Sequence, residues 1–243
     1  MLTQSHILIA GCQGSGKSVA MNGLISTLLY RLPIDQANGA QMILIDPKCV
    51  EFANYANLPH TLCYAEGYNP TDWMKALNKA LSIMDSRKQY MKQNRLKKYD
   101  KGDLYIFIDE WASIFKNKEC GRTAYTALMR LVSEGRAERV HVIMATQIPK
   151  ATIIPTEVRE NFDARLCLRT ANAIQSRVIM ENNGCETLPR YGNGFYCKPE
   201  GTQLVKIPYV KDNEIQVLLN WWDDPEHKKR MTARQAKRFT KTN

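Results

Sequence analysis

The sequence predicts an α/β fold in which helices flank a mostly parallel central sheet. Two observations lead to this prediction. Short runs of β-branched and aliphatic residues alternate along the chain with longer segments of helical periodicity, which is the pattern of βαβ units. Gly-rich and acidic motifs also stand directly after predicted strands, where open α/β sheets bind ligands. The 243 residues are enough for one large domain or two small ones.

Five short apolar runs are predicted to be strands of this sheet. Each has the length of a buried strand and is far shorter than a membrane-spanning helix. In chain order they are His6–Ala10, Gln41–Ile45, Leu104–Ile108, Val140–Ala145 and Arg165–Leu168.

Helices are predicted between these strands. Lys17–Arg31 is apolar enough all round to pack on a sheet. Two further segments, the first beginning near Asp72, carry apolar residues at the spacing of one helix face, which we expect to face the core rather than a cofactor. These positions are Trp73, Leu77, Ala80, Leu81 and Met84 in one segment, and Ala124, Leu128, Leu131 and Val132 in the other.

The last part of the chain has a different pattern. Gly192–Lys198 and Gln203–Ile207, divided by Pro199–Gly201, predict a hairpin or a pair of edge strands. Asp212 is then expected to cap a last helix, Asn213–Trp222. We therefore expect one domain over residues 1–222 and a basic tail over residues 223–243, which is too poor in large apolar residues to form a core.

The charge balance favours a polyanionic partner. The chain has 34 Lys and Arg against 24 Asp and Glu, a net charge of +10. Nucleic acid is the first candidate, and an anionic membrane surface or charge that serves only solubility are the alternatives. The basic tail and a second basic segment, Arg87–Lys101, are each either a solvated chain segment or a nucleic-acid contact.

The composition excludes several classes of protein. A hydrophobic fraction of 44% excludes a disordered chain, and the polar Thr3–His6 segment does not resemble a signal peptide. The seven cysteines are scattered, without a Cys-x-x-Cys pair, which is typical of free thiols in a reducing compartment. We therefore expect a cytoplasmic protein without a disulfide framework or a zinc site.

A phosphate-binding loop follows the first predicted strand and opens the first predicted helix. The loop has the pattern G-x-x-x-x-G-K-[ST], in which backbone N–H groups and the helix N-terminus surround phosphates. Lys17 is expected to reach the β- and γ-phosphates of ATP, and the Ser18 hydroxyl to bind Mg²⁺. The residues of this loop are Gly11, Cys12, Gln13, Gly14, Ser15, Gly16, Lys17 and Ser18.

Two carboxylates end the Leu104–Ile108 strand. We expect Asp109 to contribute to the Mg²⁺ site and Glu110 to orient and deprotonate the attacking water. Taken alone, the pair could equally cap a helix that begins at Trp111. The phosphate-binding loop upstream favours the catalytic interpretation.

A third motif, Thr146-Gln147, follows the Val140–Ala145 strand. The amide of Gln147 could hydrogen-bond the γ-phosphate or the water, although an exposed turn glutamine is the simpler alternative. The three motifs together predict ATP hydrolysis. A dinucleotide oxidoreductase is excluded, because Gly14-x-Gly16 continues into Lys17-Ser18.

Beyond these motifs, the chain resembles the motor domain of the FtsK/SpoIIIE family of double-stranded DNA translocases, within the HerA–FtsK superfamily. The resemblance runs from about His6 to Trp222. It is carried by segments that occur in the order found in the family: Ile45-Asp46-Pro47-Lys48 with Glu51, Tyr55 and Leu58-Pro59-His60, Ala145-Thr146-Gln147 with Pro149, Ser176-Arg177, Gly184-x-Glu186, Gly192-x-Gly194, and Val210-Lys211-Asp212 with Trp221.

The resemblance implies a RecA-like P-loop NTPase fold and a homo-oligomer, usually a hexameric ring around duplex DNA, with each ATP at a subunit interface. It implies that Arg136 acts as an arginine finger on the neighbouring subunit's ATP, with a solvated charge at a helix end as the alternative. It places the family's DNA-contacting loops at or near Lys150, Arg159 and Arg177, which would bind phosphates. The family often has basic residues where Ile148 and Ala173 stand here.

The expected function is therefore an ATP-hydrolysing translocase of double-stranded DNA, with ATP and Mg²⁺ as cofactors. Because the first strand begins soon after Met1, we expect a bare motor without a membrane segment, a second ring tier or a winged-helix module. A motor of this kind suits a plasmid, phage or integrative element in DNA transfer, packaging or segregation, with a membrane-anchored or capsid protein as partner. The alternatives are a slowly hydrolysing regulatory ATP switch that docks on a partner, and a single-strand helicase.

Overall fold

The computed structural model describes residues 5–31 and 39–223, and the predicted basic tail lies outside them apart from its first residue. Eight strands form one sheet in the order β3-β2-β4-β5-β1-β6-β7-β8. The strands are β1 His6–Ala10, β2 Gln41–Asp46, β3 Thr61–Glu66, β4 Leu104–Ile108, β5 Val140–Thr146, β6 Ala164–Leu168, β7 Asn193–Lys198 and β8 Gly201–Lys206.

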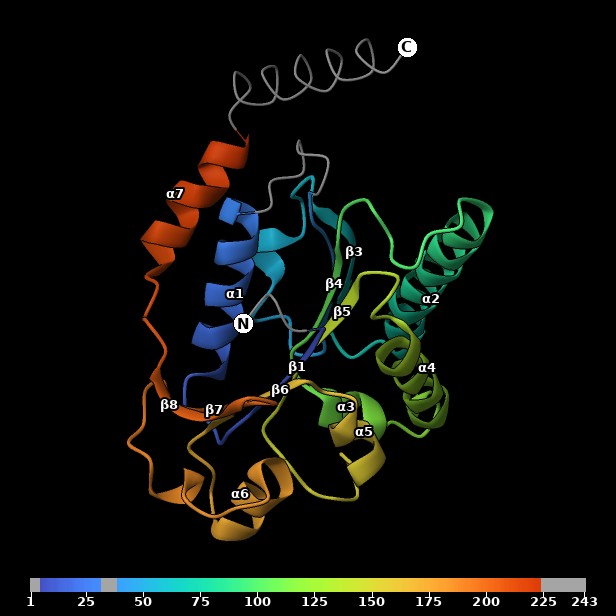
Figure 1. The fold of residues 1–243 in the computed structure, drawn as a ribbon. Helices are drawn as coiled ribbons and strands as arrows, with labels where there is room; N and C mark the ends of the chain where they lie inside the picture. Colours follow the sequence, from blue (N-terminus) through green and yellow to red (C-terminus); the bar gives the residue numbers. More distant parts are fainter. Residues whose placement is uncertain (1–4, 32–38, 224–243) are drawn as a thin grey trace.

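The helices lie on the two faces of this sheet (Figure 1). Helices α1 and α7 lie on one side, and α2 and α4 lie on the other. The helices are α1 Lys17–Arg31, α2 Pro70–Gln93, α3 Trp111–Phe115, α4 Gly121–Glu134, α5 Thr156–Glu160, α6 Ala173–Met180 and α7 Asp212–Asp223, with single 3₁₀ turns at Ala53–Tyr55 and Cys185–Thr187.

The sheet is mostly parallel, as predicted. Strands β1 to β6 pair in parallel, and only β7 and β8 add antiparallel pairs at one side. Strand β1 is buried along its whole length because its side chains alternate between two cores. Ile7 and Ile9 pack with α1 and α7, whereas Leu8 and Ala10 pack with α2 and α4. The fold class expected from the sequence is confirmed.

The predicted strands are found within one or two residues of their expected ends, and one strand had not been predicted. Strand β3 lies at the edge of the sheet and pairs only with β2. The turn between β7 and β8 is tighter than expected, because Lys198 and Gly201 already pair across it. Helix α7 begins at Asp212 rather than after it. The N–H of Lys211 donates to Oε2 of Glu214, so Lys211 stands at the capping position expected for Asp212.

The basic segment Arg87–Lys101 is only in part an extension of α2, which ends at Gln93. Arg87 itself is buried, and its guanidinium donates to the carbonyl oxygens of Glu138 and Arg139 at 2.8 and 2.9 Å. It also lies 4.5 Å from the centre of the Tyr99 ring. Arg87 therefore links α2 to the chain before β5 through hydrogen bonds. The side chain of Arg87 is neither solvated nor accessible to nucleic acid.

Two further features bear on the expectations from composition. All seven cysteines are free. Among the described residues, no helix combines the length and the hydropathy that crossing a membrane requires.

Candidate active site

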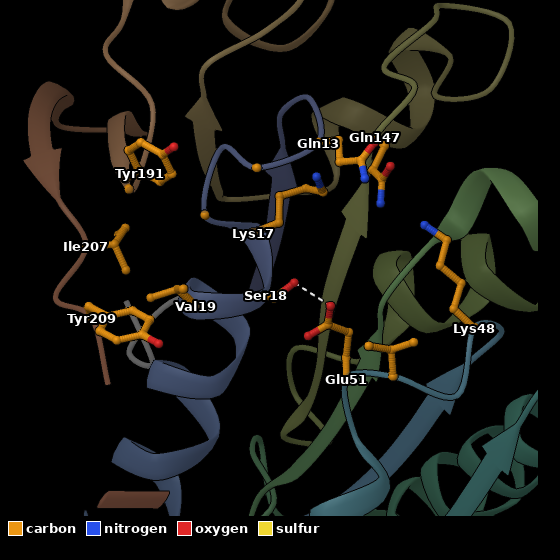
Figure 2. Close-up of a pocket in the computed structure, with 14 residues that line it drawn as sticks. Gln13, Lys17, Ser18, Val19, Lys48, Glu51, Gln147, Tyr191, Ile207 and Tyr209 are labelled. Carbon is orange, nitrogen blue, oxygen red and sulfur yellow. Dashed lines mark hydrogen bonds between the residues drawn. The ribbon is translucent and has the colours of Figure 1, made fainter. Parts of the chain in front are cut away.

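The three predicted motifs meet at the carboxyl ends of β1, β4 and β5, and a fourth segment from the end of β2 joins them. The phosphate-binding loop, the segment after β2, Gln147 and four residues between 191 and 209 line a cavity of about 780 Å³, and Glu110 lies next to it in contact with Lys48 and Gln147 (Figure 2). Lys17 and Ser18 lie in the middle of the view, with Glu51, Lys48 and Gln147 on one side of them. The sheet thus brings together residues that are up to about 200 positions apart in the chain.

The loop of residues 11–18 is held in shape by backbone contacts with distant parts of the chain. The N–H of Cys12 donates to the carbonyl of Arg169, and the N–H of Gly192 donates to the carbonyl of Ser15, both at 2.8 Å. Gly16 has φ +107°, and a Cβ atom on it would lie 2.8 Å from the backbone nitrogen of Gly192. Glycine is therefore required at position 16 both by its φ and by this close approach.

Lys17 is buried at the start of α1. Its Nζ atom donates to the carbonyl oxygens of Gly11 and Cys12 at 2.8 and 3.1 Å, so the ammonium group lies under the loop that is to hold phosphates. Burial lowers the pKa of Lys17, and the nearby charges of Glu110 and Asp109 partly oppose this shift. The ammonium group therefore lies beside the loop, and its contact with the β- and γ-phosphates stays a prediction.

Ser18 contacts Glu51, a residue that lies outside the three motifs. Its hydroxyl donates to Oε1 of Glu51 at 2.5 Å, across the gap between α1 and the loop after β2 (Figure 2). The carboxylate of Asp46 holds this loop, because its Oδ2 atom accepts the N–H groups of Glu51 and Phe52 at 2.9 and 3.0 Å. The only sequence signal for Glu51 was its place in the segment that resembles the FtsK/SpoIIIE family.

Asp109 is almost fully buried beside these acids, with 5% of its surface exposed. Burial, and then the charges of Glu51 and Asp46, raise the pKa of Asp109 to about 7. Within the described part of the chain, no donor hydrogen-bonds its carboxylate. A carboxylate without a protein donor is available to a ligand.

Glu110 is held in place by β5 and by the loop after β2. Its Oε1 atom accepts the hydroxyl of Thr146 at 2.9 Å, and both carboxylate oxygens lie 3.2 Å from the N–H of Gln147. The Nζ atom of Lys48 lies 3.6 Å from Oε2. The motif at the tip of β5 therefore contacts the second acid directly, through Thr146 and the backbone of Gln147.

The donor set fits a magnesium ion. Ser18 supplies a hydroxyl oxygen and Asp109 an unpartnered carboxylate, and Glu51 adds a carboxylate in contact with Ser18. Hard oxygen ligands of this kind are those that Mg²⁺ prefers, usually with several waters retained.

The other predicted residues lie apart from this cluster. Arg136 precedes β5, at the opposite end of that strand from Gln147. The seven residues of β5 span about 23 Å at roughly 3.3 Å per residue, so Arg136 does not reach the site of its own chain.

The three predicted DNA contacts lie on the loop and helices that follow β5 and β6. Lys150 is exposed in the loop of residues 147–155, which we call the β5–α5 loop. Arg177 is exposed on α6 and donates to Oδ1 of Asn183 at 2.8 Å. Arg159 on α5 is half-buried, and its guanidinium donates to Ile154 and Thr156. Lys150 and Arg177 are thus the more accessible cations.

The chain is similar to known proteins over most of its length. The model of the FtsK/SpoIIIE family matches residues 2–186. The DNA translocase FtsK of Helicobacter pylori is 31% identical over 231 residues, which cover 89% of this chain and 26% of that protein. The FtsK of Leptospira interrogans is 32% identical over 235 residues, which cover 88% and 24%. The chain therefore spans about a quarter of the length of these curated relatives.

The solved structures support the fold. The conjugation coupling protein TcpA of pCW3, solved with ATPγS, superposes with a TM-score of 0.75 at 21% identity, over 90% of this chain and 65% of that one. This likeness supports a RecA-like P-loop ATPase fold, with a mostly parallel sheet flanked by helices.

Proposed function

The chain belongs to the FtsK/SpoIIIE family, and from this premise we propose that it is the ATP-hydrolysing motor of a double-stranded DNA translocase. The observation that carries the proposal is the meeting of the phosphate-binding loop, two carboxylates and the tip of β5 at one edge of the sheet. Because the chain spans only about a quarter of the length of these relatives, we also propose, rather than transfer from them, its substrate and its partners.

Each residue of the site has its own role in hydrolysis. The backbone of residues 11–16 and the N-terminus of α1 hold the phosphates, and Lys17 neutralises their charge. Glu110 takes the proton of the attacking water, and Thr146 and the N–H of Gln147 keep its carboxylate oriented. The side chain of Gln147, which lines the cavity, contacts the γ-phosphate or the water.

Ser18 and Asp109 would hold Mg²⁺, with Glu51 beside Ser18. An ion held there would neutralise charge on the β- and γ-phosphates. The chain's own contribution is to keep these oxygens in place, since Asp46 fixes the backbone that carries Glu51.

The β5–α5 loop connects this chemistry to DNA. Lys150 lies exposed on it and binds a backbone phosphate, together with Arg177 and Arg159 on the following helices. The loop is tied to the site at two points, because the N–H of Ile148 donates to the Thr146 hydroxyl and the indole of Trp111 donates to the Ile153 carbonyl. When the loop moves on DNA, the Thr146 hydroxyl transmits this movement to the carboxylate of Glu110.

The active form is a homo-oligomeric ring, in which Arg136 completes the site of the neighbouring subunit. The position of Arg136, about one strand length from its own site, supports action in trans. Residues 1–222 form the motor, and residues 223–243 form a basic tail that adds phosphate contacts. A plasmid, phage or integrative element, with an anchoring partner protein, suits such a motor.

The experiment that tests this proposal is an ATPase assay with and without linear duplex DNA over a series of salt concentrations. We expect duplex DNA to stimulate hydrolysis, and the stimulation to fall as salt rises, because phosphate contacts release counterions. Single-stranded DNA of the same length is the control, and an equal stimulation by it would favour a helicase. A slow rate that DNA does not change would contradict the proposal and favour a regulatory ATP switch.

A further inference from the structure

A dense group of exposed cations lies at the end of α2. Residues 92–101, which we call the basic turn, run from the last turn of α2 into the segment before β4. The basic turn contains one acid, Asp100. Its exposed cations are Lys92, Arg95, Lys97, Lys98 and Lys101. Among the residues that the structure describes, no carboxylate lies within ion-pair distance of these five side chains.

The cations just before the basic turn are neutralised, in contrast to those within it. Lys88 on α2 pairs with Glu134 on α4 at 2.8 Å. Arg130 on α4 pairs with the same Glu134 and with Asp85 on α2. The acids of the two helices are thus taken up by other cations, and the charge of the basic turn stays uncompensated. Like charges so close together repel one another, and a polyanionic ligand relieves this repulsion.

The basic turn begins with a well-formed helix end. The N–H of Leu96 donates to the carbonyl of Met91 at 2.9 Å, and the N–H of Arg95 donates to that of Lys92 at 3.4 Å, which is a Schellman motif. Arg95 has φ +55°, at the position where this motif usually has glycine. The turn therefore carries a cation where glycine would suit its backbone better.

Two tyrosines hold the rest of the basic turn in place. The rings of Tyr90 and Tyr99 meet edge to face, with their centres 5.7 Å apart. The guanidinium of Arg87 lies 4.5 Å from the centre of the Tyr99 ring, and the ammonium of Lys101 lies 4.4 Å from that of Tyr90. The N–H of Tyr99 also donates to the carbonyl of Ala137 at 2.9 Å. Both rings thus pack within the protein and are not free to stack on unpaired bases.

The basic turn lies at the opposite edge of the sheet from the proposed DNA contacts. It leads into the amino end of β4, whereas Lys150 and Arg177 follow the carboxyl ends of β5 and β6. Figure 1 shows the end of α2 toward the top of the view, and α5 and α6 at the bottom. The seven residues of β5 span about 23 Å at roughly 3.3 Å per residue, so the two basic surfaces are separated by about the height of the sheet.

We propose that the basic turn is a second binding surface for duplex DNA, which it contacts through backbone phosphates. Duplex DNA carries one negative charge per about 1.7 Å of its axis, and flexible Lys and Arg side chains bind it without reading its sequence. Single strands are usually bound on free aromatic rings, which the basic turn does not offer. Membrane surfaces usually take up exposed apolar side chains as well, and Leu96 is half-buried.

The test is the fluorescence anisotropy of a labelled linear duplex titrated with the full chain, at salt concentrations from about 50 to 200 mM. The measurement uses no nucleotide, so its outcome is independent of the ATPase assay that tests the proposed function. The fourfold variant leaves Lys101 in place, because this residue packs on Tyr90. Its changes are Lys92→Gln, Arg95→Gln, Lys97→Gln and Lys98→Gln.

The fourfold variant should bind the duplex at least about 10-fold more weakly at the lowest salt concentration. The slope of log Kd against log salt concentration should fall by about 2 to 4, because each phosphate contact contributes about 0.9 to it. A matched control removes four exposed cations outside both basic surfaces and should leave the slope unchanged. Its changes are Arg31→Gln, Lys75→Gln, Arg122→Gln and Lys211→Gln.

Arg95→Gly separates binding from folding. Glycine adopts the left-handed backbone of this position without strain, so the variant should unfold at a higher temperature than the unaltered chain. Its salt slope should nevertheless fall by about 1, because one phosphate contact is lost. A purely structural role of Arg95 predicts no change in this slope.

Four results would overturn the inference. They are an unchanged Kd and slope in the fourfold variant, an equal loss of affinity in the matched control, and a failure of the unaltered chain to bind duplex DNA at low salt. The fourth uses vesicles that contain phosphatidylserine. If the fourfold variant loses binding to these vesicles and keeps its affinity for the duplex, the basic turn binds a membrane surface instead.

Discussion

The hydroxyl of Thr146 donates a hydrogen bond of 2.9 Å to Oε1 of Glu110. The same hydroxyl oxygen accepts the N–H of Ile148 at 3.2 Å. One atom at the tip of β5 therefore contacts both the carboxylate that we assign to the attacking water and the first part of the β5–α5 loop. In the proposed motor, the Thr146 hydroxyl thus couples the position of the DNA-facing loop to the position of the catalytic carboxylate of Glu110.

Thr146→Val tests this connection with little change in side-chain shape. We expect kcat for ATP to fall by roughly 10- to 100-fold, since a hydrogen bond to a charged group contributes about 1.5–3 kcal/mol. The KM for ATP should change little, because Thr146 does not contact the phosphate-binding loop through its side chain. Steady-state ATPase assays measure both. Thr126→Val, whose hydroxyl lies exposed on α4, is the control, and an unchanged kcat in Thr146→Val would refute the connection.

Glu110→Gln separates binding from hydrolysis. The amide oxygen can still accept the Thr146 hydroxyl, but the side chain no longer takes a proton, so turnover should fall by about 10²- to 10⁴-fold. ATP should still bind, whereas Lys17→Ala should abolish its binding. Calorimetric titration and single-turnover hydrolysis measure the two effects. Normal turnover in Glu110→Gln would remove Glu110 from the role of base.

Glu51→Gln tests the contact between Glu51 and Ser18. We expect the magnesium concentration needed for half-maximal ATP binding to rise by roughly 10- to 100-fold, as when a residue beside a metal ligand is lost. The readout is ATP affinity by calorimetry over a series of magnesium concentrations, and affinity without magnesium should not fall. Glu119→Gln, which changes an exposed acid in the turn before α4, is the control. An unaltered magnesium dependence would leave Glu51 as a structural residue only.

Mixing two inactive variants tests the proposed role of Arg136. If Arg136 completes the site of a neighbouring subunit, Arg136→Ala and Lys17→Ala are both inactive alone. A mixture should regain some ATPase activity, because some interfaces then combine an intact loop with an intact arginine. The assay measures activity against the mixing ratio at constant total protein. Absence of rescue at every ratio would assign Arg136 a role within its own chain.

His6 gives the fold a dependence on pH. Burial, and then the charge of His141, lower the pKa of His6 to about 4. Between pH 4 and about 6.5 the unfolded chain therefore binds more protons than the folded chain, so the free energy of unfolding falls as the pH falls. The protonation of His6 accounts for about 3 kcal/mol of this fall in the free energy of unfolding.

The variant His6→Asn retains an acceptor for the N–H of Val142 and does not titrate. Its free energy of unfolding in urea should depend less on pH over this range than that of the unaltered chain. Taking the difference between the two proteins cancels other groups, including Asp109, whose raised pKa acts in the opposite direction. Parallel pH profiles would contradict this account.

The strands at the centre of the sheet were predictable because both of their faces are buried, whereas β7 and β8 were predictable from the Pro199–Gly201 turn between them. Strand β1 is apolar from Ile7 to Ala10 because helices cover both sides of it, and β4 is likewise buried at each position. Strand β3 lies at the sheet edge and is half-buried, so Thr61–Glu66 mixes polar and apolar residues and has no such signal. The helices α3 and α5 have five residues each, which is too short for a helical periodicity.

The site was predictable to the extent that its residues stand in contiguous motifs. Residues 11–18, Asp109 and Glu110 are of this kind. Glu51 reaches Ser18 only because the carboxylate of Asp46 holds the loop that carries Glu51. Tyr191 and Tyr209 reach the cavity only because β7 and β8 pair beside β6. The charge pattern likewise could not predict that Arg87 is buried, since its partners are backbone carbonyls 51 and 52 residues away.

The central place of β1 has a consequence for how the chain folds while it is being made. Its neighbours in the sheet are β5 and β6, and His6 and Val142 are 136 residues apart. At about 5–20 residues per second, a ribosome needs roughly 7 to 27 seconds to add that length. Among the described strands, β1 therefore waits longest for its first partner, and the nascent chain carries an unpaired apolar strand beside the loop on which its activity depends.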